Sequence, residues 1–386
     1  MVVPFPDTPA RAISAPTETS RFITAMSAVR RLMQPLTMNS ESMEKISARS
    51  AEAKTMMRRI EMITKIPTAN KEEWKALRAK YIGGSDAASV VGLNPFSSPY
   101  ALWAEKTGKT PPFEGNLATD VGTYLEDFIA KKFEKESGKK VRRVNKSILN
   151  DKYPWAIANI DREIVGEESG LECKSTSELN TSKFRGGEYP TNYYCQCVHY
   201  LATTEKTRWF LAVLIGNKQF KIYLLTRIEN DIKPEWCESS VYISDEEIAA
   251  LMNAEKGFME NNVKKDIPPA PDGSDSTSKT ISILYPESNG ETVNLFGYEA
   301  DLKSYMTYCS LIKDMERQRD EVANRVKAFL GEAGRGESND YKVTFTTSSR
   351  STFDSKRFAS EHPDIDLSEY YKNSTYRAFK VSEKTN

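Results

Sequence analysis

The residues that are able to carry chemistry gather in one stretch, Trp155–Thr176, which contains an aspartate, a glutamate and a lysine at regular spacing. Glu172 and Lys174 lie two residues apart, so in a strand they share one face. Asp161 lies earlier in the stretch, before a GEESG turn that lets two strands pair. This geometry predicts two carboxylates and an ammonium at one point of a sheet. Such oxygens suit Mg²⁺ or Mn²⁺, and the lysine would orient or deprotonate an attacking water and offset negative charge on a phosphate.

The same spacing has a second interpretation, because exposed strands often alternate Glu and Lys. Spacing alone therefore leaves open both a metal site and a solvated strand. Another cluster, Cys195, Cys197 and His199, is a weaker candidate, because on a helix the two cysteines point to different sides and no fourth ligand is evident. We expect core cysteines there. The chain has two histidines, so carboxylates and lysines are the groups expected to do chemistry.

The composition excludes a membrane span and a global affinity for nucleic acid. Hydrophobic residues make up 39% and charged residues 28% of the 386 residues, and no apolar run approaches the roughly 18 residues needed to cross a bilayer. Lys plus Arg and Asp plus Glu number 54 each, so contact with DNA requires a local basic patch. The run Lys131–Lys146 carries eight basic residues and is either such a patch or a solvated face. The five cysteines contain no C-x-x-C pair, which favours a reducing compartment.

Extended segments must position the acidic stretch. They are expected at 155–165 and 170–175, followed by a hairpin that pairs Trp209–Ile215 with Phe220–Thr226 through Gly216-Asn217. With the helices on either side, this order predicts an α/β or α+β core with a central mixed sheet flanked by helices.

Three helices are expected in the same region. Ser98-Pro99 should open a helix over Tyr100–Thr107, and a third helix should cover Tyr193–Thr203. Between them, Asp120 is expected to cap a helix that runs to about Glu136. One apolar face of that helix should be buried, namely Val121, Leu125, Phe128, Ile129 and Phe133.

Composition divides the chain into four parts. Residues 1–66 hold eight of the twelve Met and no Trp or Tyr, which predicts a poorly ordered extension. Residues 67–263 form the predicted core, and 264–290, rich in Pro, Ser and Asp, read as a linker. Residues 291–386 are expected to form a helical segment and a small accessory module. A helix over about 296–330 carries apolar residues at alternating three- and four-residue steps, interrupted by Arg319, and this seam packs either on its own core or in an oligomer.

Motifs around the acidic stretch add a resemblance. The D-x(10)-E-x-K pattern is the signature of the PD-(D/E)XK nuclease superfamily, and the motif order resembles its λ-exonuclease-like, YqaJ-type viral recombinase branch. The matching segments are Trp74–Arg78, Ile82–Ala87, Asn94–Phe96, Ser98–Tyr100, Gly122 with Leu125-Glu126, Lys183–Gly187, Tyr194–Gln196, Phe353–Phe358, His362-Pro363 and Tyr376–Phe379. Ile160 replaces the proline of the superfamily name, a departure that touches no ligand. The resemblance implies a restriction-endonuclease-like core.

The resemblance also implies roles for the acidic residues. Asp161 would bridge two Mg²⁺ ions, for which Mn²⁺ can substitute, and Glu172 with the backbone carbonyl of Cys173 would complete the first site. Glu126 would ligate the second ion or orient its water shell. Lys174 would position the nucleophilic water.

Further residues are expected to steer the reaction and hold the DNA. Gln196 would steer Lys174 or the water. Ser85 is expected to cap a helix whose exposed N–H groups, together with the Arg78 guanidinium, would bind a 5′-terminal phosphate. The alternative is that Arg78 pairs with a nearby carboxylate and Ser85 only caps the helix. The resemblance adds two predicted DNA contacts, Lys183 and Arg185.

Together these features predict a metal-dependent DNA exonuclease of phage-type recombination. The resemblance implies digestion of linear duplex from the 5′ end to leave a 3′ single strand, a single-strand annealing protein as partner, and a ring-shaped homo-oligomer. It also implies the cytoplasm of a bacterial host, with a phage or prophage origin. Two alternatives are a restriction-type endonuclease with the same metal site and a catalytically silent DNA-binding module.

Overall fold

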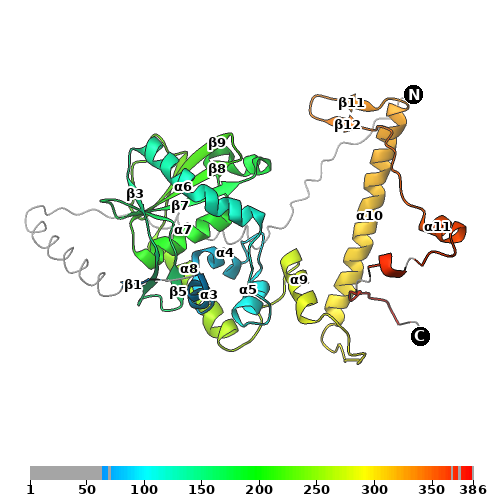
Figure 1. Cartoon of the computed structure of the whole chain (residues 1–386), viewed down its shortest axis with the longest axis horizontal. Helices are drawn as coiled ribbons and strands as arrows, with labels where there is room; N and C mark the ends of the chain where they lie inside the picture. Colours follow the sequence, from blue (N-terminus) through cyan, green and yellow to red (C-terminus); the bar gives the residue numbers. More distant parts are fainter. Residues whose placement is uncertain (1–62, 68–70, 367, 373–374, 385–386) are drawn as a thin grey trace, which may run out of the picture. The chain divides into compact units, whose positions relative to one another are not determined.

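The protein is described from a computed structural model that covers residues 63–67, 71–366, 368–372 and 375–384 (Figure 1). The chain divides into two compact units. The first ends at Leu284 and contains every candidate site residue, and the second spans Tyr285–Asn386. Of the predicted four-part division, the extension over residues 1–62 lies outside the described residues.

A six-stranded mixed sheet forms the centre of the first unit. Its neighbours pair in the order β10-β9-β8-β7-β6-β3, with β7 parallel to β8, β9 parallel to β10, and the other pairs antiparallel. In that order the strands are Ser239–Tyr242, Gln219–Thr226, Arg208–Ile215, Ser169–Thr176, Arg162–Ile164 and Val141–Arg143. A four-stranded sheet with the order β1-β4-β5-β2 lies in the same unit, and its strands are Ile63–Pro67, Lys146–Asn150, Ala156–Ala158 and Ile82–Gly83.

Helices cover both faces of the six-stranded sheet, and this explains why β8 is a continuous apolar run. Phe210 and Ala212 of β8 belong to the same apolar cluster as Ile129 and Phe133 of α6. The alternate residues of β8, beginning with Trp209, pack in the cluster that contains α7. The helices of this unit are α3 (Lys71–Ala79), α4 (Gly84–Val90), α5 (Pro99–Lys106), α6 (Leu117–Ser137), α7 (Thr191–Thr204), α8 (Asp245–Gly257) and α9 (Asp275–Leu284), with a 3₁₀ segment, η1 (Glu178–Gly187), and a π-helical turn, η2 (Phe258–Val263).

The second unit is built around one long helix. Helix α10 spans Glu299–Leu330 and none of its residues is buried. After it come a two-stranded hairpin and two short helical segments, namely β11 (Arg335–Glu337), β12 (Lys342–Thr344), α11 (Ser355–Glu361) and η3 (Ser368–Tyr370).

The mixed α/β fold with a central mixed sheet is confirmed, as are most of its elements. The hairpin pairs Trp209 with Leu225 and Ile215 with Gln219, and Gly216 at its turn has a φ of +55°. The Ser98 hydroxyl accepts a hydrogen bond from the Ala101 amide at 3.1 Å, so it caps α5 as predicted. Across the described residues, no helix is long and apolar enough to span a membrane.

Two predictions about α6 are wrong in detail. The helix starts at Leu117 rather than at Asp120, because Asn116 caps it by accepting a hydrogen bond from the Thr119 amide at 3.1 Å. Val121 and Phe128, assigned to its buried face, are 44% and 55% exposed. Leu125, Ile129 and Phe133 of the predicted face do pack in the core, so the buried stripe is narrower than predicted.

Two predicted domain boundaries also cross folded elements. Ile63–Ile66, placed in the extension, belong to β1, which pairs with β4 over five residues. The predicted linker contains α9, which packs beside α5. Hydroxyl groups make that contact, since Thr277 bonds to Ser98 at 2.8 Å between their side-chain oxygens. Polar composition alone had suggested an unstructured segment.

Candidate active site

The predicted pair of acidic residues meets where β6 begins beside β7. Arg162 of β6 pairs with Leu171 of β7, so the preceding residue, Asp161, reaches the level of Glu172. The Asp161 Oδ2 atom accepts a hydrogen bond from the backbone N–H of Cys173 at 2.8 Å. Asp161 precedes the strand rather than lying within it as predicted, and this backbone bond fixes its carboxylate.

The two oxygens of Glu172 have different surroundings. Its Oε1 atom lies 2.6 Å from the Lys174 ammonium and accepts a hydrogen bond from the Gln196 side-chain amide at 2.8 Å. Its Oε2 atom is buried and has no hydrogen-bond partner among the described residues. A buried carboxylate oxygen without a partner is costly. A bound cation would remove that cost.

The surroundings of the site raise the pKa values of both carboxyl groups and of the lysine. Burial, followed by the nearby carboxylates of Glu172 and Glu126, raises the pKa of Asp161. Burial also raises the pKa of Glu172. Although burial alone would lower the pKa of Lys174, the Glu172 and Asp161 carboxylates raise it, so Lys174 is an ammonium at neutral pH. A charged Lys174 is suited to orienting water and offsetting negative charge rather than to removing a proton.

Glu126 lies on α6 and is held by arginines. The buried Arg162 guanidinium contacts the carboxylates of Glu126 and Asp127 and also donates to the Asp161 carbonyl at 2.7 Å. Arg143 lies 3.3 Å from the Glu126 carboxylate. Across the described residues, no three Asp, Glu, His or Cys side chains gather as a metal cluster. Glu126 is therefore beside the candidate site but bound to Arg162, which sequence reasoning did not single out.

Tyr200 connects the site to the segment Ile82–Ala87, the Gly-rich motif, which contains Gly83 and Gly84. Sequence reasoning missed Tyr200. Its hydroxyl accepts from the Gln196 amide at 2.9 Å and donates to the Asn159 carbonyl at 2.8 Å. A Cβ atom added to Gly84 would lie 2.5 Å from the Tyr200 ring, so only glycine permits this approach of α4 to α7. Tyr200 and Gln196 lie four residues apart on one helix face, a spacing that would have identified the pair.

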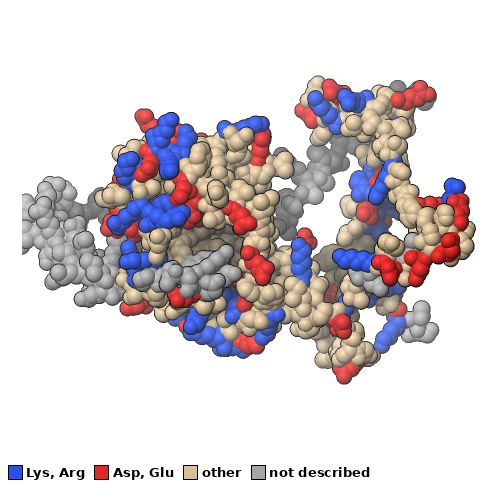
Figure 2. All heavy atoms as spheres, viewed as in Figure 1, with Lys and Arg blue, Asp and Glu red and all other residues tan. Residues whose placement is uncertain are grey.

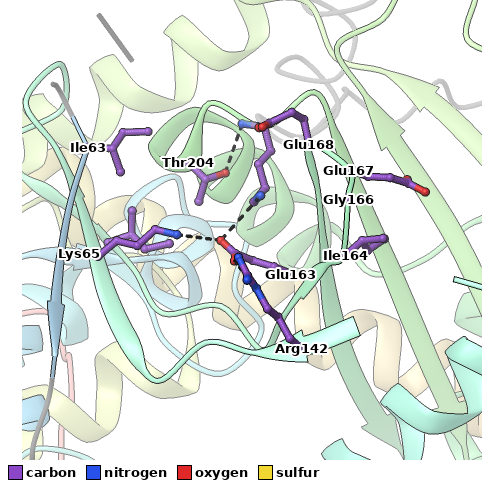
Figure 3. A pocket seen from close by; sticks show the side chains of 11 residues that line it. Ile63, Lys65, Arg142, Glu163, Ile164, Gly166, Glu167, Glu168 and Thr204 are labelled. Carbon is purple, nitrogen blue, oxygen red and sulfur yellow. Dashed lines mark hydrogen bonds and ion pairs between the residues drawn. The ribbon is translucent and has the colours of Figure 1, made fainter. Parts of the chain in front are cut away.

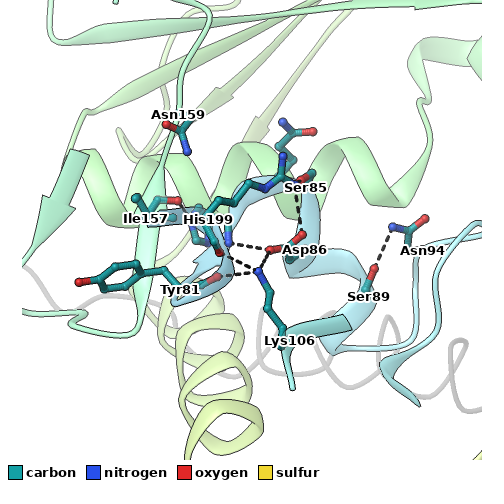
Figure 4. Close-up of polar contacts among 12 residues, drawn as sticks. Tyr81, Ser85, Asp86, Ser89, Asn94, Lys106, Ile157, Asn159 and His199 are labelled. Carbon is teal, nitrogen blue, oxygen red and sulfur yellow. Dashed lines mark hydrogen bonds and ion pairs between the residues drawn. The ribbon is translucent and has the colours of Figure 1, made fainter. Parts of the chain in front are cut away.

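The predicted phosphate pocket contains a buried ionic cluster (Figure 4). Arg78 contacts the Ser85 hydroxyl and lies 3.3 Å from the Asp86 carboxylate. Asp86 is also 2.8 Å from the buried Lys106 ammonium and accepts from the Gly83 amide at 3.0 Å. Although burial would raise it, Lys106 and Arg78 lower the pKa of Asp86 to about 2. Two cations therefore face the Asp86 carboxylate, and the Glu105 carboxylate is close enough to interact electrostatically with Arg78.

The structure corrects the predicted cap. Helix α4 begins at Gly84, with Gly83 as its cap residue, and the Asp86 side chain bonds back to Gly83. Ser85 lies in the first turn, where its hydroxyl faces Arg78. The alternative pairing of Arg78 with a carboxylate is therefore present, through Asp86.

The remaining predicted contacts are spread over the surface. Lys183 and Arg185 lie in η1 and are exposed. Several basic residues of the run Lys131–Lys146 form ion pairs with carboxylates. Examples are Lys139 with Glu167 at 2.5 Å and Arg142 with Glu163 at 2.9 Å. Figure 2 shows basic and acidic side chains interspersed over the visible face of the first unit. Ion pairs involve four of the eight basic residues, namely Lys132, Lys139, Arg142 and Arg143, and contact of the run with DNA stays a prediction.

Two other features lie apart from the carboxylates. Cys195 and Cys197 are buried in the core, as expected, and His199 bonds to Glu255 at 2.8 Å and to the Ile157 carbonyl at 3.0 Å. A cavity of about 580 Å³ is lined by Lys65, Arg142 and Lys206 around the Glu163 carboxylate, together with apolar residues (Figure 3). The three basic side chains of the cavity form ion pairs with the Glu163 carboxylate. None of the acidic residues predicted as metal ligands lines the cavity.

Comparison with known proteins defines the class. The YqaJ-like viral recombinase domain matches residues 73–207, which include the whole carboxylate and lysine cluster. Over 331 residues, the chain is 32% identical to the uncharacterized protein YqaJ of Bacillus subtilis strain 168, covering 84% of this chain and 98% of that protein. The chain therefore belongs to the YqaJ-like viral recombinase family.

More distant similarities are partial. A protein of African swine fever virus, strain Badajoz 1971 Vero-adapted, is 40% identical over 60 residues, which are 16% of this chain and 17% of that protein. The crystal structure of an alkaline exonuclease (LHK-Exo) from Laribacter hongkongensis is 20% identical, with a TM-score of 0.39, and covers 51% of this chain and 94% of that chain. No residue role is taken from these two similarities.

Proposed function

We propose that this protein is a metal-dependent DNA exonuclease that hydrolyses linear duplex from its 5′ end and leaves a 3′ single strand. The observation that carries the proposal is the Glu172 carboxylate, whose Oε1 atom is held by Lys174 and Gln196 while its buried Oε2 atom has no described partner. Membership of a viral recombinase family supports the substrate class.

The donor set suits a hard divalent cation. Asp161, Glu172 and the backbone carbonyl of Cys173 are the proposed ligands of one Mg²⁺ or Mn²⁺ ion, and Glu126 is the proposed ligand of a second ion if it leaves Arg162. A cation held by these residues would supply a Lewis acid for a phosphate oxygen and would lower the pKa of a bound water.

The side chains around the ligands have separate tasks. Lys174, kept charged by Glu172 and Asp161, orients the attacking water and offsets negative charge that develops on the phosphate. Gln196 holds Glu172 in place and is itself fixed by Tyr200. The burial of Glu172 restricts bulk water at this point of the sheet.

Polarity is proposed to arise at the Gly-rich motif. The Arg78 guanidinium, beside Asp86 and Lys106, supplies a fork of N–H donors, and the Ser85 hydroxyl adds a hydrogen-bonding group. A terminal 5′-phosphate would accept hydrogen bonds from these two groups. Packing of Gly84 against Tyr200 links this cluster to Gln196 and Glu172, so an end bound there lies near the proposed metal ligands. Lys183 and Arg185 are proposed contacts to the DNA backbone.

The activity is tested with linear and covalently closed circular duplex in Mg²⁺. We expect digestion of the linear DNA alone, with a 5′ label released as a nucleotide while a 3′ label stays on a long single strand. Cleavage of the circle would identify an endonuclease, and binding without hydrolysis of either DNA would identify a silent module. The 3′ single strand produced is the expected substrate of a single-strand annealing protein. The family resemblance implies such a protein as partner, and it also implies a ring-shaped oligomer.

The end preference has its own test. Wild-type protein should digest 5′-phosphorylated duplex faster than 5′-hydroxyl duplex. A charge-assisted phosphate contact contributes roughly 1.5–3 kcal/mol, so Arg78→Ala should lose about tenfold or more of that preference. An unchanged preference in Arg78→Ala would exclude Arg78 from phosphate binding.

A further inference from the structure

Helix α7 carries a buried histidine, His199, that lies between two hydrogen-bond acceptors. Its side chain is fully buried, as is that of Glu255 on α8. The His199 Nδ1 atom lies 2.8 Å from the Glu255 Oε1 atom, and its Nε2 atom lies 3.0 Å from the backbone carbonyl of Ile157 on β5 (Figure 4). One imidazole ring therefore joins α7 to α8 and to the four-stranded sheet.

The two acceptors decide how many hydrogens the pair of His199 and Glu255 holds. A carbonyl oxygen only accepts, so the Nε2 atom must carry a hydrogen and donate it to Ile157. The Nδ1 atom and the Glu255 oxygen also need a hydrogen between them, because two lone pairs this close would repel. That hydrogen belongs either to an imidazolium beside a carboxylate or to a carboxylic acid beside a neutral ring. In both forms the pair holds one proton more than a neutral histidine and an ionised glutamate hold in water.

Burial favours retention of this proton. Without it, an ionised carboxylate would face the lone pair of Nδ1 inside the core, where an uncompensated charge is costly. Burial raises the pKa of Glu255, although His199 opposes the shift. Although burial would lower the pKa of His199, Glu255 raises it. Both shifts have the direction that the hydrogen-bond geometry requires.

Other titratable groups around the pair keep one charge state near neutral pH. Asp86 of α4 acts on both members, and although burial would raise its own pKa, Lys106 and Arg78 lower it to about 2. On α7, burial raises the pKa of Cys195 to about 12 and also raises the pKa of Tyr200. The residues of β5 are Ala, Ile and Ala and contribute no titratable group. Asp86 is therefore charged near neutral pH, and the cysteine and tyrosine are neutral.

The contacts of α7 continue from the pair towards the carboxylates. Tyr200, the residue after His199, donates from its hydroxyl to the carbonyl of Asn159 at 2.8 Å. Ile157 and Asn159 are alternate residues of one segment, and Asp161 is the next alternate residue. Two neighbouring side chains of α7 therefore hold two successive alternate carbonyls of the segment that ends at Asp161.

We propose that His199 and Glu255 are positioning residues, which hold α7 against the segment ending at Asp161 by means of one proton that the folded protein retains above the pH at which a free histidine loses it. Through α7 they also fix Gln196, which holds Glu172 at 2.8 Å. Their effect on hydrolysis rests on the proposed function, whereas retention of the proton does not.

NMR of the His199 ring tests retention of the proton. The chain has two histidines, so labelling a His362→Gln protein with ¹³C,¹⁵N-histidine gives the signals of His199 alone. We expect these signals to stay constant from about pH 5.5 to 8.5, with a hydrogen on Nε2 throughout, whereas a free histidine titrates at about pH 6.5. A titration midpoint at or below about pH 6.5, or an Nε2 atom without hydrogen, would overturn the proposal.

Urea unfolding of the full chain tests what the proton does for the fold, with Glu255→Gln as the matched variant. In this variant the amide donates to Nδ1 of a neutral ring whose Nε2–H still donates to Ile157, so both bonds remain without the extra proton. Above about pH 6.5 the unfolded wild type lacks that proton, so its unfolding equilibrium constant should rise by about tenfold per pH unit relative to the variant. The groups that the two proteins share cancel in this comparison. Parallel pH profiles for the two proteins would contradict the proposal.

Hydrolysis of linear duplex in Mg²⁺ separates positioning from a purely structural contact. Glu255→Met keeps most of the side-chain volume but removes the bond to Nδ1. We expect kcat of the folded variant to fall by about tenfold or more with KM unchanged, because the displaced groups hold the carboxylates rather than the DNA. Glu255→Gln should recover most of that loss.

The outcomes for the pair and for the nuclease are distinct. Wild-type kcat in folded Glu255→Met would overturn the positioning role. No hydrolysis by the wild-type protein would contradict the proposed function, and the NMR and unfolding results would then decide whether the pair retains its proton.

Discussion

At the residue scale, the candidate site carries more negative charge than its neighbours balance. Asp161 and Glu172 lie close together, and Lys174 is the cation that contacts Glu172. Arg162 is occupied by Glu126 and Asp127 on α6. The protein without a bound cation therefore holds two carboxylates in an environment that disfavours their ionised forms.

Neutralising Asp161 tests this imbalance. Asp161→Asn removes one charge but keeps an oxygen that accepts from the Cys173 amide. In a chelator at neutral pH, the variant should melt at a higher temperature than wild type, because the raised pKa of Asp161 means that its ionisation destabilises the fold. Mg²⁺ should raise the melting temperature of wild type and not that of the variant. Equal stabilisation of both proteins by Mg²⁺ would contradict the role of Asp161 as a ligand.

Asp86 should show the opposite dependence on pH. Because Lys106 and Arg78 lower the pKa of Asp86 to about 2, its carboxylate stabilises the fold at neutral pH by about 2 kcal/mol. That contribution is present above about pH 4 and is lost as the pH falls towards 2. Urea unfolding at a series of pH values should show a steeper loss for wild type than for Asp86→Asn.

Lys106 keeps other partners in the Asp86→Asn variant, so the substitution changes little besides the carboxylate. Its ammonium also donates to the carbonyls of Arg78 at 3.0 Å and Tyr81 at 2.7 Å. Parallel pH profiles for wild type and Asp86→Asn would mean that the cluster does not stabilise the fold through this carboxylate.

Residue spacing predicted the strand that carries Glu172 and Lys174 but not the links between distant segments. The two-residue repeat of a strand placed Glu172 and Lys174 together, because that periodicity is local. Tyr200 and Arg162 were missed because their partners, Gly84 and Glu126, come from helices far away in the sequence. Ser85 was predicted as the cap but lies two positions after it, since Gly83 is the cap residue and the Asp86 side chain bonds back to the Gly83 amide.

At the element scale, the approach of α4 to α7 joins the two halves of the proposed site. Gly84→Ala would place a methyl group 2.5 Å from the Tyr200 ring. Forced overpacking of this kind costs about 1–3 kcal/mol, and displacement of Tyr200 would also release Gln196. We expect lower stability and lower activity, measured by urea unfolding and DNA hydrolysis. Gly273→Ala, where no atom lies within 4 Å, is the control and should resemble wild type.

An active Gly84→Ala protein of wild-type stability would show that α4 is free to shift.

Element types in this region were predictable because β8 and α7 have strong apolar patterns. The ends of the elements were harder to predict than their types. At the start of α6, Asn116 and Asp120 are both good caps, and the longer helix satisfies more backbone groups. Helix α9 was missed because its burial depends on hydroxyl contacts with α5 rather than on an apolar stripe.

At the scale of the whole molecule, β1 is the first described element of the core. Deleting residues 1–62 should preserve stability and DNA hydrolysis. Deleting 1–67 should lower the free energy of unfolding by about 1–2 kcal/mol, because β4 loses one of its two partner strands and Glu163 loses Lys65 at 3.0 Å. Urea unfolding of the two truncated proteins measures the difference. Equal stability would show that β1 contributes nothing to the core.

The central claim is that Glu172 belongs to a metal-dependent hydrolytic site. The most direct measurement is hydrolysis of 5′-phosphorylated linear duplex in Mg²⁺ by wild type and by Glu172→Gln, with thermal unfolding confirming that both are folded. The amide keeps the shape of the side chain but removes the charge that a divalent cation requires. Wild type should release nucleotides, and Glu172→Gln should be slower by at least about a hundredfold. Wild-type turnover in Glu172→Gln, or no hydrolysis by the wild-type protein, would contradict the account.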